Sequence, residues 1–469
     1  MKNREEEIIL DCPVMSTTQD GKGVVKIDGR VIFVDFAVEG DIVDIRVKRR
    51  SKKYLVGEIV RISTPSPNRV QAHCEHFGKC GGCKLQYIDY AKQLEIKSQH
   101  VRDALERIGK VEIESFLPIQ GSAENRFYRN KLDYAFSSKR WLTIDEIQTL
   151  PENVDRSGLG FHMPGMFDKV LDVTYCYHQI DPSNAIRDAV KEYARKHEMD
   201  FYDIRMHSGL LRNMIIRSSS LNQWMVIIAF TELNEKTKGL LEFVKNKFPE
   251  IKSLQYAINN KKNDVIYDLD LVTYAGEDFI YEMIGEYKFK VGAKSFFQTN
   301  SAQAKVLYDI TRDFANIQPN EIVYDLYTGV GSIGIYCSKN AQKVIGIELV
   351  EAAIADAKIN AALNNIENCS FFASDMRKLF DASFIAKHGK PDVIITDPPR
   401  AGMDEPVVQT LLDTACKRIV YVSCNPSTQA RDLELLSAKY RVVKVQPVDM
   451  FPHTVHVESV ALLELKTTF

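Results

Sequence analysis

The sequence predicts an α/β protein in three parts: a small antiparallel barrel, a central α+β domain and a C-terminal doubly wound sheet. Short apolar and polar alternations broken by glycine turns fill residues 8–62. Strand-like and helical stretches then mix without regular order, and in the last third of the chain seven strand-like segments alternate with helical ones. The expected domains are therefore 1–66, 67–290 and 291–469.

Composition sets the broad class. At 469 residues the chain is too long for one ordinary domain, and 45% hydrophobic with 26% charged residues is typical of a globular protein. No apolar run approaches the roughly 20 residues that span a bilayer, and MKNREEEIIL lacks the apolar block of a signal peptide. We expect a cytoplasmic protein without membrane association.

The barrel prediction rests on the bursts GVVKI, RVIFVDF, DIVDIRV and YLVGEIV, separated by DGKG, DGR, EGD and KRRSKK. The prolines of TPSPNR end the last strand. Residues 46–69 carry eight Lys or Arg against the single acid Glu58, although the whole chain has a net charge of -2. This local excess predicts contact with a polyanion, and a solvated charge run on a hairpin is the alternative.

Cysteine spacing indicates a metal centre. Nine cysteines in a chain without an export signal favour metal binding or catalysis over disulfides. Cys74, Cys80 and Cys83 form C-x5-C-x2-C, which is one ligand short of a closed four-coordinate site. Four thiolates suit iron-sulfur or zinc equally, and His73 and His76 keep a mixed zinc site open.

The central domain contains the run NRFYRNK at residues 125–131, which interleaves cations with aromatic rings. That mixture suits a folded RNA loop, because bases stack on rings and phosphates need positive charge. The alternative places Phe127 and Tyr128 in the core of a strand.

The C-terminal strands read EIVYDLY, KVIGIEL, CSFFA, DVIIT, RIVYVS, YRVVKVQPV and HVESVALLEL. The first strand runs into DLYTGVGSIG, a literal GxGxxG, and Glu348 follows about 20 residues later. A dinucleotide and S-adenosylmethionine both fit this pattern. The stiff segment from Asp397 to Arg400, DPPR, favours S-adenosylmethionine, because a methyl acceptor must be held against the sulfonium.

Cys424 follows the fifth strand, and Glu458 lies near the start of the seventh. In methyltransferase sheets the last strand is antiparallel, so Glu458 is expected at the same edge as Cys424. A thiolate and a carboxylate are what methylation at carbon 5 of uracil requires: the thiolate adds to carbon 6, and a base later removes the carbon 5 proton. The alternative for Cys424 is a small buried core residue.

Five segments, SCNPSTQARD, FPHTVHVES, DPPRAG, FFQTN and DLYTGVG, resemble the motifs of the RNA uridine-5-methyltransferase family in the family order. The resemblance implies a class I methyltransferase domain in which Cys424 is the nucleophile and Glu458 the base. It also implies an S-adenosylmethionine site lined by Gln298, Tyr327, Glu348 and Asp397. One departure is Thr328, which stands where many members carry cysteine.

The resemblance extends to the first two domains. The barrel, with its VEGDIV segment, is similar to the OB-like TRAM domain, which implies RNA contacts by Lys48, Arg49, Arg50, Lys52 and Lys53. Members with this cysteine spacing hold a 4Fe-4S cluster, whose ligands here would be Cys74, Cys80, Cys83 and Cys176. The cluster is expected to be architectural, because methyl transfer moves no single electrons.

The implied substrate is uridine in 23S rRNA, and we expect a monomer. Two alternatives remain open. One is the same reaction on tRNA, and the other is a non-catalytic RNA-binding assembly factor, against which the intact Cys424 and Glu458 argue.

Overall fold

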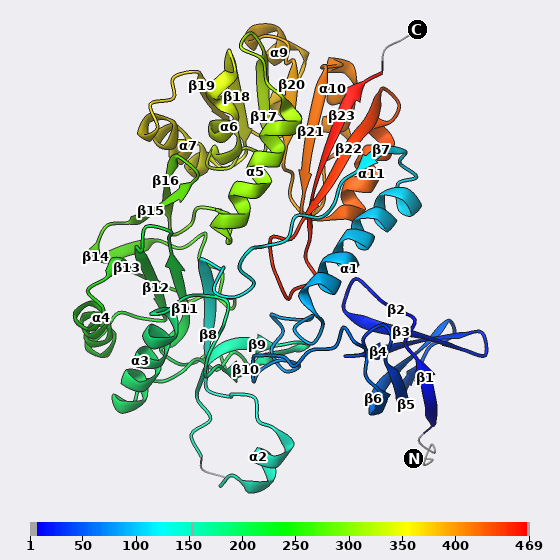
Figure 1. Cartoon of the computed structure of the whole chain (residues 1–469). Coiled ribbons are helices and arrows are strands. Elements are labelled where there is room, and N and C mark those ends of the chain that lie inside the picture. The colour runs from blue at the N-terminus through cyan, green and yellow to red at the C-terminus, as the bar shows by residue number, and fades with distance from the viewer. Residues whose placement is uncertain (1–6, 152–153, 467–469) are drawn as a thin grey trace.

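The computed structural model describes residues 7–151 and 154–466. Figure 1 shows the C-terminal domain at the top, the central domain at the lower left and the barrel at the lower right, with the helix α1 between the C-terminal domain and the barrel. The first six residues of the expected barrel domain and the last three of the expected C-terminal domain lie outside the described residues.

The N-terminal domain is one six-stranded sheet with the order β1-β5-β6-β4-β3-β2. Its strands are β1 (Ile8–Pro13), β2 (Ser16–Thr17), β3 (Lys22–Ile27), β4 (Arg30–Asp35), β5 (Ile42–Arg50) and β6 (Tyr54–Thr64). Alternate apolar residues such as Val25, Val34 and Ile45 are buried inside it. The expectation of a wholly antiparallel barrel was wrong in one pair, since β4 and β6 run parallel.

A helical segment leads from the barrel to the rest of the molecule. Helix α1 (Tyr90–Asp103) continues as a π-helical turn, η1 (Ala104–Ile108), and the chain then forms the short strand β7 (Ile113–Phe116). Val101 and Leu105 are buried in the core of the C-terminal domain. In Figure 1 the segment runs diagonally from the barrel to the edge of the upper sheet.

The central domain confirms the α+β expectation. Its seven-stranded sheet has the order β10-β9-β8-β11-β12-β13-β14, and only β12 and β13 pair in parallel. The strands are β8 (Lys131–Ser137), β9 (Gly158–Met163), β10 (Met166–Asp172), β11 (Leu211–Ser218), β12 (Trp224–Phe230), β13 (Ile251–Ile258) and β14 (Leu271–Gly276). The helices are α2 (Ile144–Thr149), α3 (Ser183–Lys196) and α4 (Glu235–Lys247). Trp224, Phe230 and Leu240 are fully buried in the core between α3, α4 and the sheet.

The C-terminal sheet contains all seven predicted strands and one more, in the order β19-β18-β17-β20-β21-β23-β22-β7. The seven are β17 (Ile322–Leu326), β18 (Lys343–Glu348), β19 (Cys369–Ala373), β20 (Val393–Thr396), β21 (Arg418–Ser423), β22 (Tyr440–Val448) and β23 (Glu458–Leu465). The expected seven-stranded sheet is therefore corrected to eight. The edge of β22 would otherwise be unpaired, and β7 covers it in parallel register.

Helices cover both faces of this sheet. On one face lie α5 (Ser301–Ala315), α6 (Ser332–Cys337) with the turn η2 (Ser338–Asn340), and α7 (Glu351–Leu363). On the other lie α8 (Met376–Leu379), α9 (Ala382–His388), α10 (Glu405–Thr414) and α11 (Pro426–Leu436). Such a layered arrangement leaves the carboxyl edge of the parallel strands open for a site.

A hairpin of β15 (Phe279–Ile284) and β16 (Tyr287–Gly292) precedes α5. Its residues Ile280, Ile284 and Phe289 are buried in a core cluster shared by the C-terminal domain and the central strands β11 and β12. The expected division at residues 290 and 291 therefore cuts a hairpin that packs against both domains. Across residues 7–151 and 154–466, no helix combines the length and apolar character needed to cross a membrane.

Candidate active site

Cys424 lies at the carboxyl end of β21, immediately after Ser423. Asn425 caps α11 by accepting a hydrogen bond from Ser427 N at 3.1 Å, and Pro426 takes the first helical position, where its missing N–H costs nothing. The strand therefore stops and the helix starts within two residues. The thiol is half-buried and stays at the rim of the sheet.

The DPPR segment is joined to this turn. Its residue Arg400 offers its carbonyl oxygen to Asn425 Nδ2 at 3.0 Å and to Thr428 Oγ1 at 3.2 Å. One backbone carbonyl thus links the loop after β20 to the first turn of α11. This arrangement holds Asp397 and Cys424 in one structural unit.

Glu458 begins β23, which runs antiparallel to both β21 and β22, as expected. The ladder pairs Ser423 with Ser459, so one further step in this register brings Cys424 level with Glu458. The carboxyl group is buried, with 4% of the residue exposed. Among the described residues its side chain has no hydrogen-bond partner.

Burial and like charge shape the acidity of this group. Burial and, to a smaller extent, the charge of Asp397 together raise the pKa of Glu458 to about 8, while the charge of Arg400 opposes the shift. Asp397 keeps a partly exposed edge, but burial and the neighbouring Asp325 raise its pKa to about 7. Burial, Glu458 and Asp397 raise the pKa of Cys424 to about 11. Two carboxyl groups and a thiol therefore share one pocket edge that favours a cation.

Arg400 was not singled out from the sequence, although it is part of the DPPR motif. Its side chain is exposed, and its charge lowers the pKa of both Cys424 and Glu458. It is the cation that the structure adds to the predicted site. The motif offered a signal, but only the fold places it beside the thiol.

The glycine loop after β17 alternates through the left-handed backbone region, at Tyr327 (φ 62°), Gly329 (φ 56°) and Gly331 (φ 78°). Glycine suits position 331 because its positive φ strains other residues, and a Cβ there would lie only 3.1 Å from Ala357 and Phe371. A Cβ on Gly329 would meet no atom within 4 Å. The loop is tightly packed on one side and open on the other, as a ligand cradle must be.

Glu348, at the end of β18, lies beside this cradle. One carboxylate oxygen accepts a hydrogen bond from Gly329 N at 3.2 Å, and the other accepts from Leu349 N at 2.8 Å and Val350 N at 3.1 Å. These backbone donors fix the carboxylate. The predicted neighbours Tyr327 and Glu348 are therefore at the same end of adjacent strands.

Asp325 and Thr328 stabilise the loop from beneath. Asp325 accepts hydrogen bonds from the Thr328 hydroxyl and from Gly334 N at 2.9 Å. Burial raises the pKa of Asp325 to about 7. Thr328, the departure from the family pattern, thus makes a buried hydrogen bond that holds the turn.

Gln298 lies in the loop before α5 and is half-buried. Its backbone carbonyl oxygen accepts a hydrogen bond from Asn130 Nδ2 at 3.0 Å. The NRFYRNK segment (residues 125–131) therefore contacts the FFQTN segment (residues 296–300) directly. Neither Phe127 nor Tyr128 lies in a strand, which corrects that alternative. Tyr128 is buried and donates to the Pro452 carbonyl at 3.0 Å, whereas Phe127 is 39% exposed.

The four predicted cluster cysteines come from two segments that approach each other. Burial, with smaller contributions from Cys80, Cys176 and Cys74, raises the pKa of Cys83 to about 12. Cys83 Sγ lies 2.9 Å from His178 Nε2. Within residues 7–151 and 154–466, no three His, Cys, Asp or Glu residues are arranged to hold a metal ion. The donor set suits a centre that prefers thiolates, but no ligand shell is formed.

The two histidines of the mixed zinc alternative have other contacts. His76 Nε2 lies 3.0 Å from Thr174 N and 2.9 Å from its hydroxyl. The ring of His73 packs edge-on against Tyr177 and His453, with centroids 5.1 Å apart in each case. His76 therefore already has hydrogen-bond partners in the protein.

The five basic residues of the barrel that are predicted to contact RNA fall into two groups, according to whether they form an ion pair among the described residues. Lys48 pairs with Glu58 at 2.8 Å, and Arg50 pairs with Glu7. Within the described ranges the other three make no ion pair: Arg49, Lys52 and Lys53. These three are exposed and remain available to phosphates.

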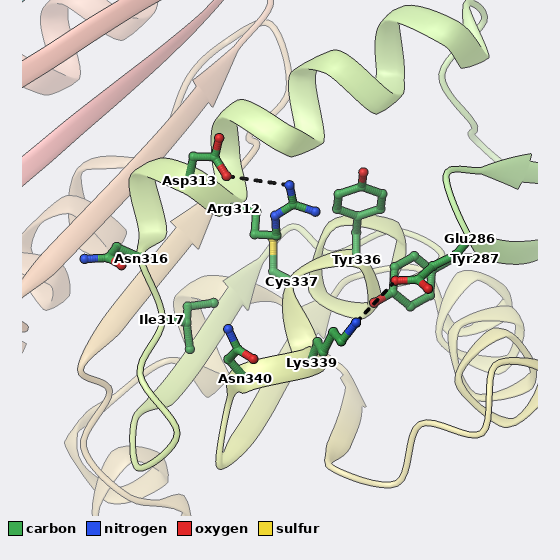
Figure 2. Close-up of a pocket in the computed structure, with 10 residues that line it drawn as sticks. All are labelled: Glu286, Tyr287, Arg312, Asp313, Asn316, Ile317, Tyr336, Cys337, Lys339 and Asn340. Carbon is green, nitrogen blue, oxygen red and sulfur yellow. Dashed lines mark ion pairs between the residues drawn. The ribbon is translucent and has the colours of Figure 1, made fainter.

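A cavity of about 530 Å³ lies elsewhere, between the end of α5, the end of α6 and the turn of the β15–β16 hairpin. Figure 2 shows its charged residues in ion pairs, Arg312 with Asp313 at 3.6 Å and Lys339 with Glu286 at 3.8 Å. None of the predicted site residues lines it. The cavity is therefore separate from the edge that carries Cys424.

Two protein-family models match the chain. The model described as tRNA (Uracil-5-)-methyltransferase matches residues 276–466. The model described as tRNA (uracil(54)-C(5))-methyltransferase, TRAM domain, matches residues 12–68. The two matches fall on the C-terminal domain and on the barrel.

Similar proteins extend the match to nearly the whole chain. An uncharacterized RNA methyltransferase of Bacteroides thetaiotaomicron is 52% identical over 95% of this chain and 99% of its own. One from Porphyromonas gingivalis is 49% identical over 96% and 98%. The crystal structure of Pyrococcus abyssi tRNA (uracil-54, C5)-methyltransferase in complex with S-adenosyl-L-homocysteine superposes with a TM-score of 0.74 at 31% identity, covering 96% of this chain and all of that one. With these matches and this site, the chain belongs to the RNA uridine-5-methyltransferase family.

Proposed function

We propose that this protein transfers a methyl group from S-adenosylmethionine to carbon 5 of a uridine in RNA, with Cys424 as nucleophile and Glu458 as general base. The observation that carries the proposal is the register of β21 and β23, which brings the thiol level with the buried carboxyl group. The chemistry needs both groups within reach of one uracil ring, the thiol at carbon 6 and the carboxylate at the proton on carbon 5.

The glycine loop is suited to S-adenosylmethionine. Gly329 faces open space, and Glu348 is fixed where it can accept hydrogen bonds from ribose hydroxyls. Gln298, Tyr327 and Asp397 complete the proposed contacts. When bound, the cofactor supplies the methyl group and a positive sulfonium, which the acidic pair Asp397 and Glu458 favours.

In the first step Cys424 adds to carbon 6 of the uracil. The thiolate forms the sulfur–carbon bond, and the ring electrons move to the carbon 4 oxygen, so that carbon 5 becomes nucleophilic and accepts the methyl group. The raised pKa of Cys424 means that its proton must leave before attack. Arg400 assists this loss, because its charge stabilises the thiolate.

In the second step Glu458 removes the proton from carbon 5. The released electron pair restores the double bond between carbons 5 and 6, and the Cys424 thiolate leaves. A pKa of about 8 makes Glu458 a stronger base than an exposed carboxylate. It must be ionised when it acts, so turnover is expected to rise with pH through neutrality.

RNA containing 5-fluorouridine tests the assignment, because fluorine takes the place of the proton that Glu458 removes. The wild-type protein with S-adenosylmethionine should form a denaturation-stable adduct, and Cys424→Ala should form none. Cys369→Ala, a half-buried cysteine of the same domain, is the matched control and should behave as wild type. An adduct that persists in Cys424→Ala would exclude this residue as the nucleophile.

For the substrate we propose uridine in 23S rRNA, with the barrel and the cysteine segment as RNA-holding parts. The alternative substrate is tRNA, because the similar Pyrococcus abyssi enzyme is a tRNA (uracil-54, C5)-methyltransferase. A methylation map of both RNAs from a deletion strain separates the two. Loss of 5-methyluridine from tRNA alone would overturn the ribosomal assignment.

We further propose that Cys74, Cys80, Cys83 and Cys176 hold a 4Fe-4S cluster, with zinc as the alternative. The thiols influence one another's pKa, which supports this set, although among the described residues no three of them are arranged to hold a metal ion. Anaerobically purified protein should absorb visible light, and Cys80→Ser should lose that absorbance while the buried Cys416→Ser keeps it. Colourless protein containing stoichiometric zinc would favour the alternative.

We also propose that the protein acts as a monomer. One chain supplies the thiol, the base and the glycine loop, so the site needs no residue from a second copy. Light scattering in the presence and absence of RNA should give the mass of one chain per complex. A stable dimer would contradict this.

A further inference from the structure

The loop of residues 449–457 joins β22 to Glu458, the proposed base. Its first residue, Asp449, is fully buried and follows Val448, which pairs with Glu458 in the ladder. The loop therefore leads directly into the start of β23, next to the pair formed by Val448 and Glu458. A group that fixes Asp449 therefore also affects the position of Glu458, because Val448, the residue before Asp449, pairs with Glu458.

Helix α1, which is distant from Asp449 in the sequence, binds the Asp449 side chain. Lys97 Nζ donates to Asp449 Oδ1 at 2.6 Å, and Tyr90 OH donates to Oδ2 at 2.8 Å. Lys97 also donates to the Phe451 carbonyl at 3.0 Å. The ammonium thus binds both a side chain and the backbone of the loop.

Gln93 extends the same contact. Its Oε1 accepts from His453 N at 3.1 Å, and its Nε2 lies 3.2 Å from His453 Nδ1. Tyr90, Gln93 and Lys97 are spaced i, i+3 and i+7, so one polar face of the helix lies against the loop. These hydrogen bonds connect α1 to the loop at three successive points.

The ion pair is sealed from solvent. Lys97 is 2% exposed and Asp449 is fully buried. A buried pair of this kind is rigid, because moving either charge would leave the other unpaired in a medium that solvates it poorly. The pair is therefore suited to holding a loop in one position.

We propose that Lys97 is a positioning residue for Glu458. The buried Lys97–Asp449 pair sets the turn before β23 and thereby holds Glu458 against Cys424. Lys97 itself touches neither substrate nor cofactor. This inference rests on the proposed function, since it assigns a role only if Glu458 removes the carbon 5 proton.

Displacement of Glu458 should affect only one step of the reaction, the removal of the carbon 5 proton. A displaced base slows release of the methylated product but leaves addition of Cys424 to carbon 6 intact. Covalent adduct should then accumulate on ordinary RNA, which a general loss of folding would not produce. Displacement of a catalytic group by about 1 Å can slow a reaction by a factor on the order of 100.

The test is Lys97→Met in the full-length protein. We expect turnover to fall at least about tenfold, KM for RNA to fall with it because the covalent adduct accumulates, and denaturation-stable adduct to build up on ordinary RNA. Lys92→Met is the matched control on the same helix, because Lys92 pairs at the surface with Glu39 at 3.3 Å and Glu95 at 2.9 Å. It should keep wild-type turnover without adduct.

A second variant covers the case in which Lys97→Met fails to fold. Lys97→Met combined with Asp449→Asn removes both charges, so no lone carboxylate stays buried. It should recover thermal stability while the turnover defect and the adduct remain, because the ammonium no longer binds the loop backbone. A folded variant with wild-type turnover and no adduct would overturn the inference.

The two proposals fail in different ways. If the wild-type protein forms no adduct with 5-fluorouridine RNA, the proposed function fails before Lys97 is considered. If wild type and Cys424→Ala behave as proposed but Lys97→Met matches Lys92→Met, only the positioning role fails.

Discussion

At the residue scale, Glu458 shows how backbone position sets acidity. The strand β23 starts at this residue, so its carboxyl group is enclosed by the sheet edge and has no hydrogen-bond partner among the described residues. Desolvation then favours the neutral acid, and Asp397 adds repulsion. The same environment that makes Glu458 a stronger base makes its ionised form costly to the fold.

This cost predicts a pH-dependent difference between wild type and Glu458→Gln. The folded pKa of about 8 lies above the ordinary value of 4.5, so between these values folded protein holds a proton that unfolded protein has released. The contribution of Glu458 to stability is therefore present below pH 4.5 and is lost as pH rises towards 8. The uncharged glutamine escapes this loss, so Glu458→Gln should gain stability relative to wild type, on the order of 3.5 kcal/mol between pH 5 and pH 8.

Urea unfolding at several pH values measures this difference. Glu464→Gln, at the partly exposed far end of the same strand, is the control and should track wild type. Equal pH dependence of wild type and Glu458→Gln would show that Glu458 is ionised at neutral pH in the free protein.

At the scale of elements, Asn425 has two functions in one side chain. It caps α11, and it also donates to the Arg400 carbonyl, which connects the helix to the DPPR loop. Asn234 caps α4 of the central domain in a capping box and makes no such link. A comparison of the two caps can therefore distinguish a loss of helix stability from a change in the geometry of the site.

We predict that Asn425→Ala and Asn234→Ala each lower the free energy of unfolding by about 1 kcal/mol. Only Asn425→Ala should slow methyl transfer, by about tenfold, because the DPPR loop loses its link to the nucleophile turn. Chemical denaturation and single-turnover methylation measure the two effects. Equal activity of the two variants would show that the link to Arg400 does not matter for the reaction.

Elements with strong local patterns could be predicted from the sequence. Strands such as Val393–Thr396 are fully buried, apolar except for the last residue and flanked by turn residues, and the direction of β23 follows from the family pattern. Cys424 and Glu458 were placed correctly at one edge because strand direction alone brings their ends together.

Elements that depend on distant partners could not be predicted. Strand β7 has four residues and exists because the edge of β22 accepts it. The polar face of α1, with Gln93 and Lys97, suggests exposure to solvent by helical periodicity. In the structure it is buried against a loop about 350 residues away, whose position no local pattern encodes.

At the scale of the whole molecule, the barrel is joined to the body through a small apolar cluster. Tyr87, Ile88 and Ile96 from the segment around the start of α1 pack with Val38 of the barrel. Tyr87 OH also donates a hydrogen bond to the Gly21 carbonyl of the barrel at 2.6 Å. These contacts hold the barrel in place, and they do not include the basic hairpin, which is the turn between β5 and β6 that carries Lys52 and Lys53.

This arrangement predicts that the barrel affects RNA binding and not chemistry. Replacing the unpaired, exposed Lys52 and Lys53 by alanine should raise KM for RNA and leave the single-turnover rate at saturation unchanged. Each phosphate contact contributes about 1 to the slope of log affinity against log salt, so the slope should fall by about 2. Lys236→Ala with Lys238→Ala on α4 removes the same charge from the central domain and is the control. An unchanged salt slope in the barrel variant, or an equal change in the control, would mean that the basic hairpin is a solvated surface with no phosphate contacts.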